Sequence, residues 1–379
     1  MKNHYDVIVI GGGVMGLSSA YHLGFDTKKV LLLEQFKIGH DRGASHGEER
    51  IFRYAYPEID YVKLAMQAKR LWDFWGREGM GGFIINDGGL DIGETAEEIS
   101  RVKAIRDALY SCGAKYTELN ATMMRDKYPQ WKLDESAYAL FSPDSGVIRA
   151  KGTIYALIRF LTAFGVKIHE EEPVCEVMRR ESGVEVITPS GKYFSERLVI
   201  TGGAWTNKLL KNLGVILPLE VTQEQVAYFS PHAKYYTFGA SSFPVFIHHK
   251  NRAIYGFPLC LDLGIKVAFH HDGHVINVDE YDLEQRSSVT VRLRAYLNQY
   301  LPEAAGPTKL VKTCLYTSTP DKNFIVDLFP GAPNIAVGAG FSGHGFKFAP
   351  AIGRALADLV LYGKTQMHIP HFSLQRFLR

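Results

Sequence analysis

The stretch that decides the fold is YDVIVIGGGVMG, residues 5–16. Tyr5 to Ile10 form a short run rich in β-branched residues, which predicts a parallel strand buried on both faces. The glycines that follow fit the pattern G-x-G-x-x-G, and the apolar residues after them have helical spacing. A second apolar run, Val30 to Leu33, ends in Glu34. Strand, glycines, helix, strand and acid therefore occur in the order of a dinucleotide-binding unit.

Each part of this unit has a physical role. Gly11 permits a tight turn, Gly13 lets the backbone approach a pyrophosphate, and Gly16 allows the helix to pack closely on the strand. Val14 and Met15 lie in the first helical turn, where free N–H groups and the helix dipole favour phosphate. Glu34 is placed to bind ribose hydroxyls and would repel a 2′-phosphate, so NADP is disfavoured. The motif leaves FAD and NAD open.

Composition narrows the function further. The chain has 379 residues, enough for two or three domains, and its 43 basic and 40 acidic side chains give no reason to expect a nucleic-acid partner. No apolar run reaches the ~18 residues of a membrane span. The four cysteines, Cys112, Cys175, Cys260 and Cys314, show no metal-binding spacing, so we expect reduced thiols and a cytoplasmic protein.

The remaining pattern predicts an α/β protein with a second, α+β domain built on a mixed sheet. Helices are expected over residues 58–76, 95–112, 151–165 and 286–300, with short strands between 166 and 201. A last strand, 334–340, leads into a second glycine-rich turn and a helix that stops at Gly363. Two such turns at opposite ends of the chain predict one Rossmann-like nucleotide-binding domain from residues 1–84, 147–220 and 320–379. Residues 85–146 and 221–319 are predicted to form the substrate domain.

Further motifs are spread over the rest of the chain. They are Ser45-His46-Gly47 with Arg50 and Arg53, Tyr255-Gly256-Phe257-Pro258, Lys266, Cys314-Leu315-Tyr316-Thr317 and the run GAGFSGHGFK at 338–347. Together with Gly11–Gly16 they resemble the monomeric sarcosine oxidase and pipecolate oxidase family of FAD enzymes. The resemblance implies a two-domain flavoprotein that oxidises a secondary or N-methyl amino acid to an imine and passes the electrons to O2, giving hydrogen peroxide.

The resemblance also assigns roles to residues. Cys314 would carry a covalent thioether to FAD, and Ser45, His46, Gly343, His344, Gly345 and Phe346 would contact the cofactor. Arg53 and Tyr255 would hold the substrate carboxylate, and Arg50 would lie on the same helical face as Arg53 if this segment is helical. Lys347 would stabilise negative charge on the reduced flavin. Apart from the resemblance, Lys312 stands two residues before Cys314, where its charge would favour the thiolate. Lys266 would promote reaction with O2, while His270 and Tyr316 would line the substrate site.

Two positions depart from the family pattern. Glu49 stands where relatives carry a small hydroxyl residue, and Ile247 stands where the sarcosine enzyme has methionine. The following residues, His248-His249-Lys250, suggest extra positive charge near the mouth of the site, which would suit a substrate with a second carboxylate. His270, His271 and His274 have no supporting acid or cysteine spacing, so no metal site is expected.

Two alternatives remain open at this stage. One is an FAD amino-acid dehydrogenase that uses an acceptor other than oxygen, and the other is a flavin-binding protein without turnover. Lys266 favours oxygen as acceptor, and a carboxylate clamp would serve no purpose without a substrate. We expect a monomer whose partners are a small amino acid and O2.

Overall fold

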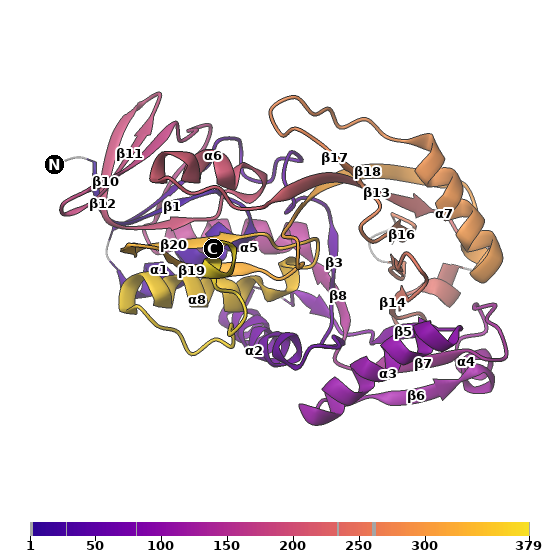
Figure 1. Cartoon of the computed structure of the whole chain (residues 1–379). Coiled ribbons are helices and arrows are strands. Elements are labelled where there is room, and N and C mark those ends of the chain that lie inside the picture. The colour runs from indigo at the N-terminus through magenta and orange to yellow at the C-terminus, as the bar shows by residue number, and fades with distance from the viewer. Residues whose placement is uncertain (1–2, 28, 81, 233–234, 260–262, 379) are drawn as a thin grey trace.

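Two large sheets organise the chain, as the computed structural model in Figure 1 shows. The structure describes residues 3–27, 29–80, 82–232, 235–259 and 263–378, and every structural statement below refers to these residues. Cys260, one of the four predicted thiols, lies outside them, and the other three cysteines are free. Within the described part, no helix combines the length and the apolar character that a membrane crossing requires.

The first sheet has eight strands and contains the strand that precedes the glycine motif. Its parallel centre runs β12, β1, β2, β9, and β20 pairs with β12, also in parallel. The strands are β1 (His4–Ile10), β2 (Val30–Leu33), β9 (Lys167–His169), β10 (Glu176–Arg180), β11 (Gly183–Thr188), β12 (Gly191–Ile200), β19 (Ile325–Phe329) and β20 (Ala332–Ala339).

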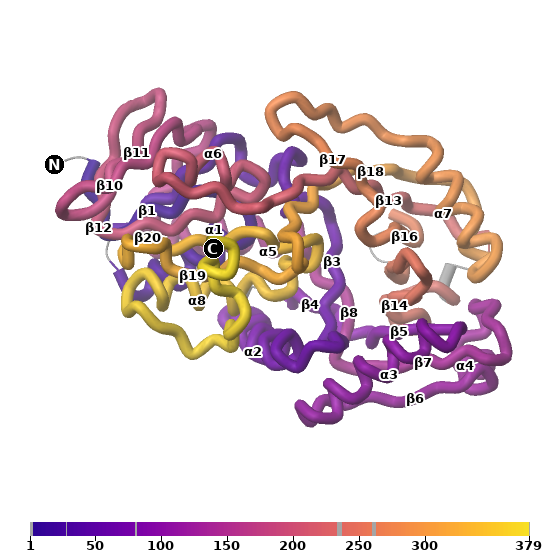
Figure 2. Tube along the Cα trace, in the orientation of Figure 1, coloured from indigo at the N-terminus to yellow at the C-terminus, as the bar shows by residue number. Residues whose placement is uncertain are grey.

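Both faces of this sheet are buried, because side chains alternate between two cores. Val7 and Val9 of β1 point into a core shared with the helices, whereas Ile8 and Ile10 point into a second core on the opposite face. The helices that contribute to the first core are α1 (Val14–Asp26), α2 (Ile59–Trp75), α3 (Ala96–Ser111), α5 (Ala150–Ala163) and α8 (Ala349–Tyr362). Figure 2 shows the first and last parts of the chain, indigo and yellow, running together in this region.

The second sheet has nine strands and is mostly antiparallel. Its strands are β5 (Gly89–Gly93), β6 (Thr117–Asn120), β7 (Tyr138–Ser142), β13 (Glu220–Phe229), β14 (Val245–His248), β15 (Ile254–Gly256), β16 (Ile265–Phe269), β17 (His274–Val275) and β18 (Thr308–Ser318). Helices α3 (Ala96–Ser111), α4 (Ala121–Lys127) and α7 (Ser287–Tyr300) accompany it, and α6 (Thr206–Leu210) follows β12 of the first sheet.

A small third sheet adjoins the other two. It consists of β3 (Glu49–Phe52), β8 (Gly146–Arg149) and β4 (Ile84–Ile85). The predicted fold class is confirmed by this mixed α/β architecture, and the predicted helices agree with α2, α3, α5, α7 and α8 to within one or two residues at most ends. Gly363 ends α8 in the left-handed conformation, as predicted. The domain boundaries remain a prediction.

Candidate active site

The glycine motif forms a cradle at the start of α1. Gly11 has a positive φ of 103°, which favours glycine, and a Cβ on Gly16 would lie 1.8 Å from the Gly11 carbonyl oxygen. Helix α1 has no acidic residue in its first turn and no side-chain cap on Gly13. Glu34, at the end of β2, accepts hydrogen bonds from the N–H groups of Gly12 (2.6 Å) and Phe36 (2.9 Å). This cradle suits the pyrophosphate and ribose of a dinucleotide.

Ser45 and His46 lie beside the cradle. The Val14 N–H donates to Ser45 Oγ at 3.0 Å. Burial, and secondarily Arg50, lower the pKa of His46 to about 4, so this imidazole is neutral at pH 7. Its Nε2 is buried without a hydrogen-bond partner among the described residues. The unpartnered Nε2 of His46 is therefore available to form a hydrogen bond with a dinucleotide bound in the glycine cradle.

The segment that holds Arg50 is a strand, so the expected helical face is wrong. Residues 49–52 form β3, which pairs with β8, and Arg53 follows the strand. The hydrogen bonds between β3 and β8 hold this segment in an extended conformation, although the two arginines have the spacing of a helix. The Arg50 guanidinium donates to the carbonyl oxygens of Glu49 and Ala44, both at 2.8 Å, and packs over the Phe346 ring.

The second sheet supplies the other side of the site, through alternation along its strands. Asp91, Ile247, Tyr255 and Ala268 are paired in one row across β5, β14, β15 and β16. Their neighbours along the strands, such as Leu90, Phe246 and Val267, are buried in a core that includes Leu293 and Leu297 of α7. One face of the sheet therefore packs on α7, and the other is left for chemistry.

Arg53 is held at this face by a buried carboxylate. Its Nη1 lies 3.7 Å from Asp91 Oδ1, and the same oxygen lies 2.8 Å from His249 Nε2. The Arg53 guanidinium also lies 4.4 Å from the centre of the Tyr56 ring. Because Nη1 is buried and has no hydrogen-bond partner in the described chain, this guanidinium retains donor capacity for a carboxylate.

Tyr255, Tyr316 and His270 form a hydrogen-bonded group. The Tyr316 hydroxyl donates to Tyr255 and lies 3.4 Å from His270 Nδ1. Burial, helped by His271 and Arg53, lowers the pKa of His270 well below its ordinary value. The imidazole is therefore neutral and adds no charge beside Arg53.

Lys347 enters the site from the second glycine-rich turn. Its Nζ donates to the Tyr56 hydroxyl at 2.9 Å and to the His344 carbonyl at 2.7 Å. Burial, with Arg53 and Arg50, lowers the pKa of this lysine well below its ordinary value. Gly343 has a φ of 77°, and a Cβ there would lie 2.2 Å from Tyr316 Cε2, so glycine lets the turn approach the tyrosine.

Lys266 and Cys314 complete the set of predicted residues. The Lys266 Nζ donates to the Glu49 carbonyl at 3.1 Å and lies 4.3 Å from the centre of the Phe257 ring. Burial raises the pKa of Cys314, although Arg50 and Lys266 oppose this effect. These two cations, and not Lys312 as expected, are the ones that favour a thiolate at Cys314.

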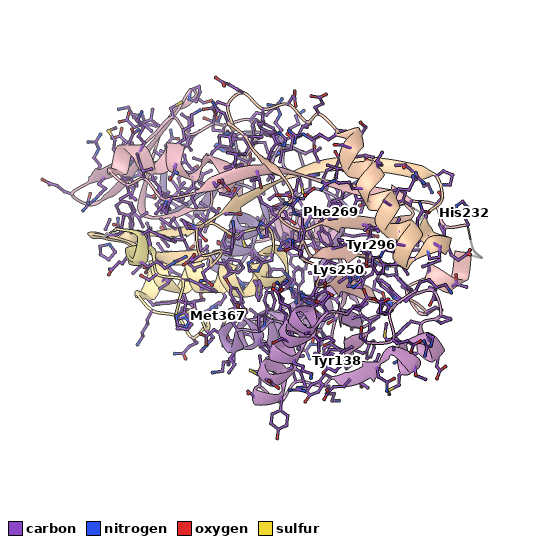
Figure 3. All side chains as sticks on the ribbon, turned by 45° about the vertical axis from the view of Figure 1, so that its right-hand side comes forward. Tyr138, His232, Lys250, Phe269, Tyr296 and Met367 are labelled. Atoms are coloured by element: carbon purple, nitrogen blue, oxygen red, sulfur yellow. The ribbon has the colours of Figure 1, made fainter. Side chains whose placement is uncertain are left out.

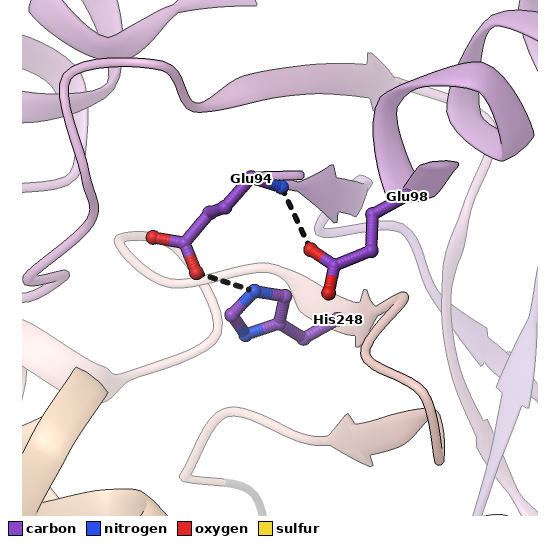
Figure 4. A group of neighbouring side chains, drawn as sticks. All are labelled: Glu94, Glu98 and His248. Atoms are coloured by element: carbon purple, nitrogen blue, oxygen red, sulfur yellow. Dashed lines mark hydrogen bonds and ion pairs between the residues drawn. The ribbon is translucent and has the colours of Figure 1, made fainter. Parts of the chain in front are cut away.

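The positive charge expected at His248 and Lys250 does not reach the cavity, because burial lowers the pKa of His248 and two carboxylates contact Lys250. Lys250 Nζ contacts Glu94 and lies 3.5 Å from Glu98 Oε2. His248 Nε2 lies 3.2 Å from Glu94 Oε2, as Figure 4 shows. His248 Nδ1 is 3.0 Å from the Tyr296 hydroxyl of α7, and Figure 3 labels Lys250 and Tyr296 in this region. Of the three residues, only His249 lines the cavity.

Glu94, Glu98 and His248 also have the donor atoms of a metal site, all within 4.8 Å of one another. However, the Lys250 ammonium contacts both carboxylates and already supplies the cation. The cluster is accounted for as a buried ion network.

A single cavity of about 640 Å³ connects these parts. It extends from the glycine cradle and Glu34 to Arg53, Tyr255 and His270, and Lys266, Cys314 and Lys347 contribute to its wall. All residues predicted to catalyse or to bind the cofactor line this cavity except Gly16, which packs against the backbone of Gly11. A nucleotide cradle at one end and a carboxylate-binding arginine at the other fit a dinucleotide cofactor whose reactive ring meets an amino acid.

Comparison with known proteins identifies the cofactor. The chain matches the FAD dependent oxidoreductase family over residues 6–359. The chain belongs to this family. It is 34% identical to monomeric sarcosine oxidase of Bacillus sp. (strain NS-129) over 99% of this chain and 98% of that protein. It is also 34% identical to human peroxisomal sarcosine oxidase, over 99% and 97% of the two chains.

Solved structures agree with these relatives. NikD, described as an unusual amino acid oxidase essential for nikkomycin biosynthesis, has a TM-score of 0.85 and 25% identity, covering 98% of this chain and 97% of its own. L-proline dehydrogenase from P. horikoshii has a TM-score of 0.88 at 23% identity, covering 100% and 98%, and shows the fold alone. The predictions of an FAD-dependent oxidoreductase and of the resemblance to sarcosine oxidase are confirmed.

Three residues of the site were not predicted from the sequence. Tyr56 bonds Lys347, Asp91 holds Arg53, and Thr201 Oγ1 donates to the Ile10 carbonyl at 2.9 Å beneath the glycine turn. Asp91 had a signal that could have found it. It is the one charged residue in Gly89-Leu-Asp-Ile-Gly93. In a strand, alternation places its side chain on one face and its apolar neighbours Leu90 and Ile92 on the other.

Proposed function

We propose that the protein oxidises a secondary or N-methyl amino acid to an imine and transfers the electrons to O2, giving hydrogen peroxide. The observation that carries the proposal is the continuity of the cavity from the glycine cradle to Arg53 and Lys266. In the overall reaction, the amine loses two electrons and two protons, which convert O2 to hydrogen peroxide. FAD, when bound, supplies the two-electron acceptor.

Residues of the chain would bind and orient the substrate. Arg53 offers a buried guanidinium donor to the carboxylate, and Tyr255 would provide a second hydrogen bond. Because Arg53 and Tyr255 fix the substrate carboxylate, they determine which C–H bond of the substrate faces the cofactor. Neutral His270 can accept a hydrogen bond from the substrate amine. Ile247, beside Tyr255 in the sheet, would limit the space for the side chain.

Positive charge would stabilise the reduced cofactor and the reaction with oxygen. Arg50 and Lys347 lie at the cavity beside the second glycine-rich turn, and Lys266 lies on β16. Charges fixed in a site with little water act more strongly than in solution. We further propose that Cys314 forms the covalent link to FAD, because it lines the cavity and the charges of Arg50 and Lys266 favour its thiolate. A monomeric state and a cytoplasmic location remain predictions.

Anaerobic bleaching of the flavin absorbance tests the proposed reaction. The purified enzyme is mixed with sarcosine, other N-methyl amino acids, L-proline, L-pipecolate, saccharopine and D-amino acids. We expect bleaching by secondary or N-methyl amino acids, and return of the absorbance with stoichiometric peroxide when air is admitted. Bleaching by primary D-amino acids alone would overturn the substrate class. Bleached enzyme that air does not reoxidise would favour the dehydrogenase alternative.

A further inference from the structure

Glu49 is a carboxylic acid sealed inside the protein without a partner. Its residue is 1% exposed, and neither carboxyl oxygen has a hydrogen-bond partner among the described residues. Other buried acids of the site differ, since Glu34 and Asp91 both contact N–H groups. An ionised carboxylate in this setting is costly unless a nearby charge compensates it. Its presence therefore calls for a role beyond packing.

Lys266, like Arg50, contacts the main chain of Glu49. Its Nζ donates to the main-chain oxygen of Glu49, which ties the lysine to the first residue of β3. Lys266 is also buried, and its ammonium packs against Phe257 and Tyr228. Lys266 lines the cavity, where it is proposed to meet dioxygen, whereas Glu49 lies behind this wall.

The two groups influence each other's ionisation. Burial raises the pKa of Glu49 to about 7, against the opposing effect of Lys266. Burial, followed by Arg50, lowers the pKa of Lys266 to about 8, and Glu49 opposes this shift. Both charges therefore change close to neutral pH, and each depends on the other.

Other charged groups near Glu49 and Lys266 also shift the pKa values of these two residues. Glu48 and Arg50, its neighbours along the chain, act on Glu49 in opposite senses. Lys312 and Cys314 on β18 act on Lys266 more weakly than Arg50 and Glu49 do. Tyr228 on β13 is kept protonated by burial, because its pKa is raised above the ordinary value.

We propose that Glu49 is a positioning residue that sets the charge of Lys266, and thereby makes the reaction of the reduced enzyme with oxygen depend on pH near neutrality. This inference rests on the proposed function, in which Lys266 meets dioxygen. Below neutral pH the carboxyl is uncharged and the ammonium acts alone. As pH rises, the carboxylate cancels part of the ammonium's field, and then the ammonium itself loses its proton.

Glu49→Gln removes the negative charge and keeps the size of the side chain. Without the carboxylate, the Lys266 ammonium is less stable, so its pKa falls. Competitive labelling of the purified holoenzyme with acetic anhydride across pH 5–10, read by peptide mass spectrometry, reports the neutral amine of Lys266. We expect labelling at pH 7 to be about threefold or more faster in Glu49→Gln than in the wild type. Equal labelling midpoints would overturn the proposal.

Glu48→Gln provides the matched control. Glu48 is adjacent in sequence, pairs with Lys151 at 3.4 Å and has a partly exposed side chain. It should leave the labelling of Lys266 at the wild-type value. A change as large as that of Glu49→Gln would show a general charge effect and contradict the specific pair.

Reoxidation provides the second readout. The flavin is reduced by light without substrate and then mixed with oxygenated buffer in a stopped-flow instrument. We expect two titration steps in the wild-type rate, and in Glu49→Gln only one, at lower pH than the upper wild-type step. Identical pH profiles would overturn the proposal, while failure of every amino acid to bleach the flavin would overturn only the proposed function. Glu49→Thr repeats both measurements if the glutamine variant does not fold.

Discussion

Replacing Lys250 by methionine removes the cation from the buried network between β14 and α3. The replacement keeps the length of the side chain, so the main change is loss of charge. Glu94 is 5% exposed, and its carboxylate contacts Lys250, His248 and the Asp134 N–H group. After the change, Glu94 keeps two of these partners, and Glu98 loses its only neighbouring ammonium in the cluster.

The size of the effect follows from the pKa of Glu94. Burial alone would raise this pKa, but hydrogen bonds from His248, Lys250 and the Asp134 N–H group lower it from 4.5 to about 2. That difference corresponds to roughly 3 kcal/mol of folding free energy. Because His248 and Asp134 keep their share, we expect Lys250→Met to cost about 2 kcal/mol at pH 7.

Urea unfolding followed by circular dichroism at several pH values measures this cost. A carboxylate with a lowered pKa stabilises the fold above about pH 4.5, and the stabilisation is lost as pH falls towards 2. The difference between wild type and Lys250→Met should therefore shrink from pH 7 to pH 3. Lys69→Met, which breaks a pair with the half-exposed Asp73, should cost less than about 1 kcal/mol. A cost for Lys250→Met that stays constant over this pH range would refute the electrostatic explanation.

Three further changes test the site. Gly16→Ala places a Cβ 1.8 Å from the Gly11 carbonyl, so the purified variant should have lost most of its flavin absorbance; wild-type flavin content would contradict the close packing of the cradle. Arg53→Lys loses the planar two-pronged donor, and anaerobic titration should give a substrate dissociation constant roughly ten- to a hundredfold higher with the flavin spectrum preserved. An unchanged constant would remove Arg53 from the carboxylate clamp. Cys314→Ala should release its flavin on acid precipitation, whereas the wild-type pellet stays yellow, and a colourless wild-type pellet would exclude the covalent link.

The parts of the fold that depend on local pattern could be predicted from the sequence. The β1–α1–β2 unit has a strand period, glycines at fixed spacing and a terminal acid, and each of these acts over fewer than about 35 residues. The site residues were found through family motifs, and the structure brings them to one cavity. What the sequence did not predict is which groups pair across the sheets.

The wrong predictions illustrate this limit. Arg50 and Arg53 have helical spacing, but pairing of β3 with β8, about 100 residues away, makes the segment extended. Lys250 is positive in sequence, but Glu94 and Glu98 on the neighbouring β5–α3 segment neutralise it, and burial lowers the pKa of His248 so that it adds no charge. In both cases a partner distant in the chain overrides the local pattern.

The single row of Asp91, Ile247, Tyr255 and Ala268 also constrains how the molecule matures. Asp91 is more than 150 residues from the other three members along the chain, so no short fragment of the polypeptide contains the row. Long-range pairing of this kind is slow to form, and it must be complete before the catalytic wall exists. Capture of the cofactor would then stabilise only finished molecules, and partly folded ones would remain exposed to proteases.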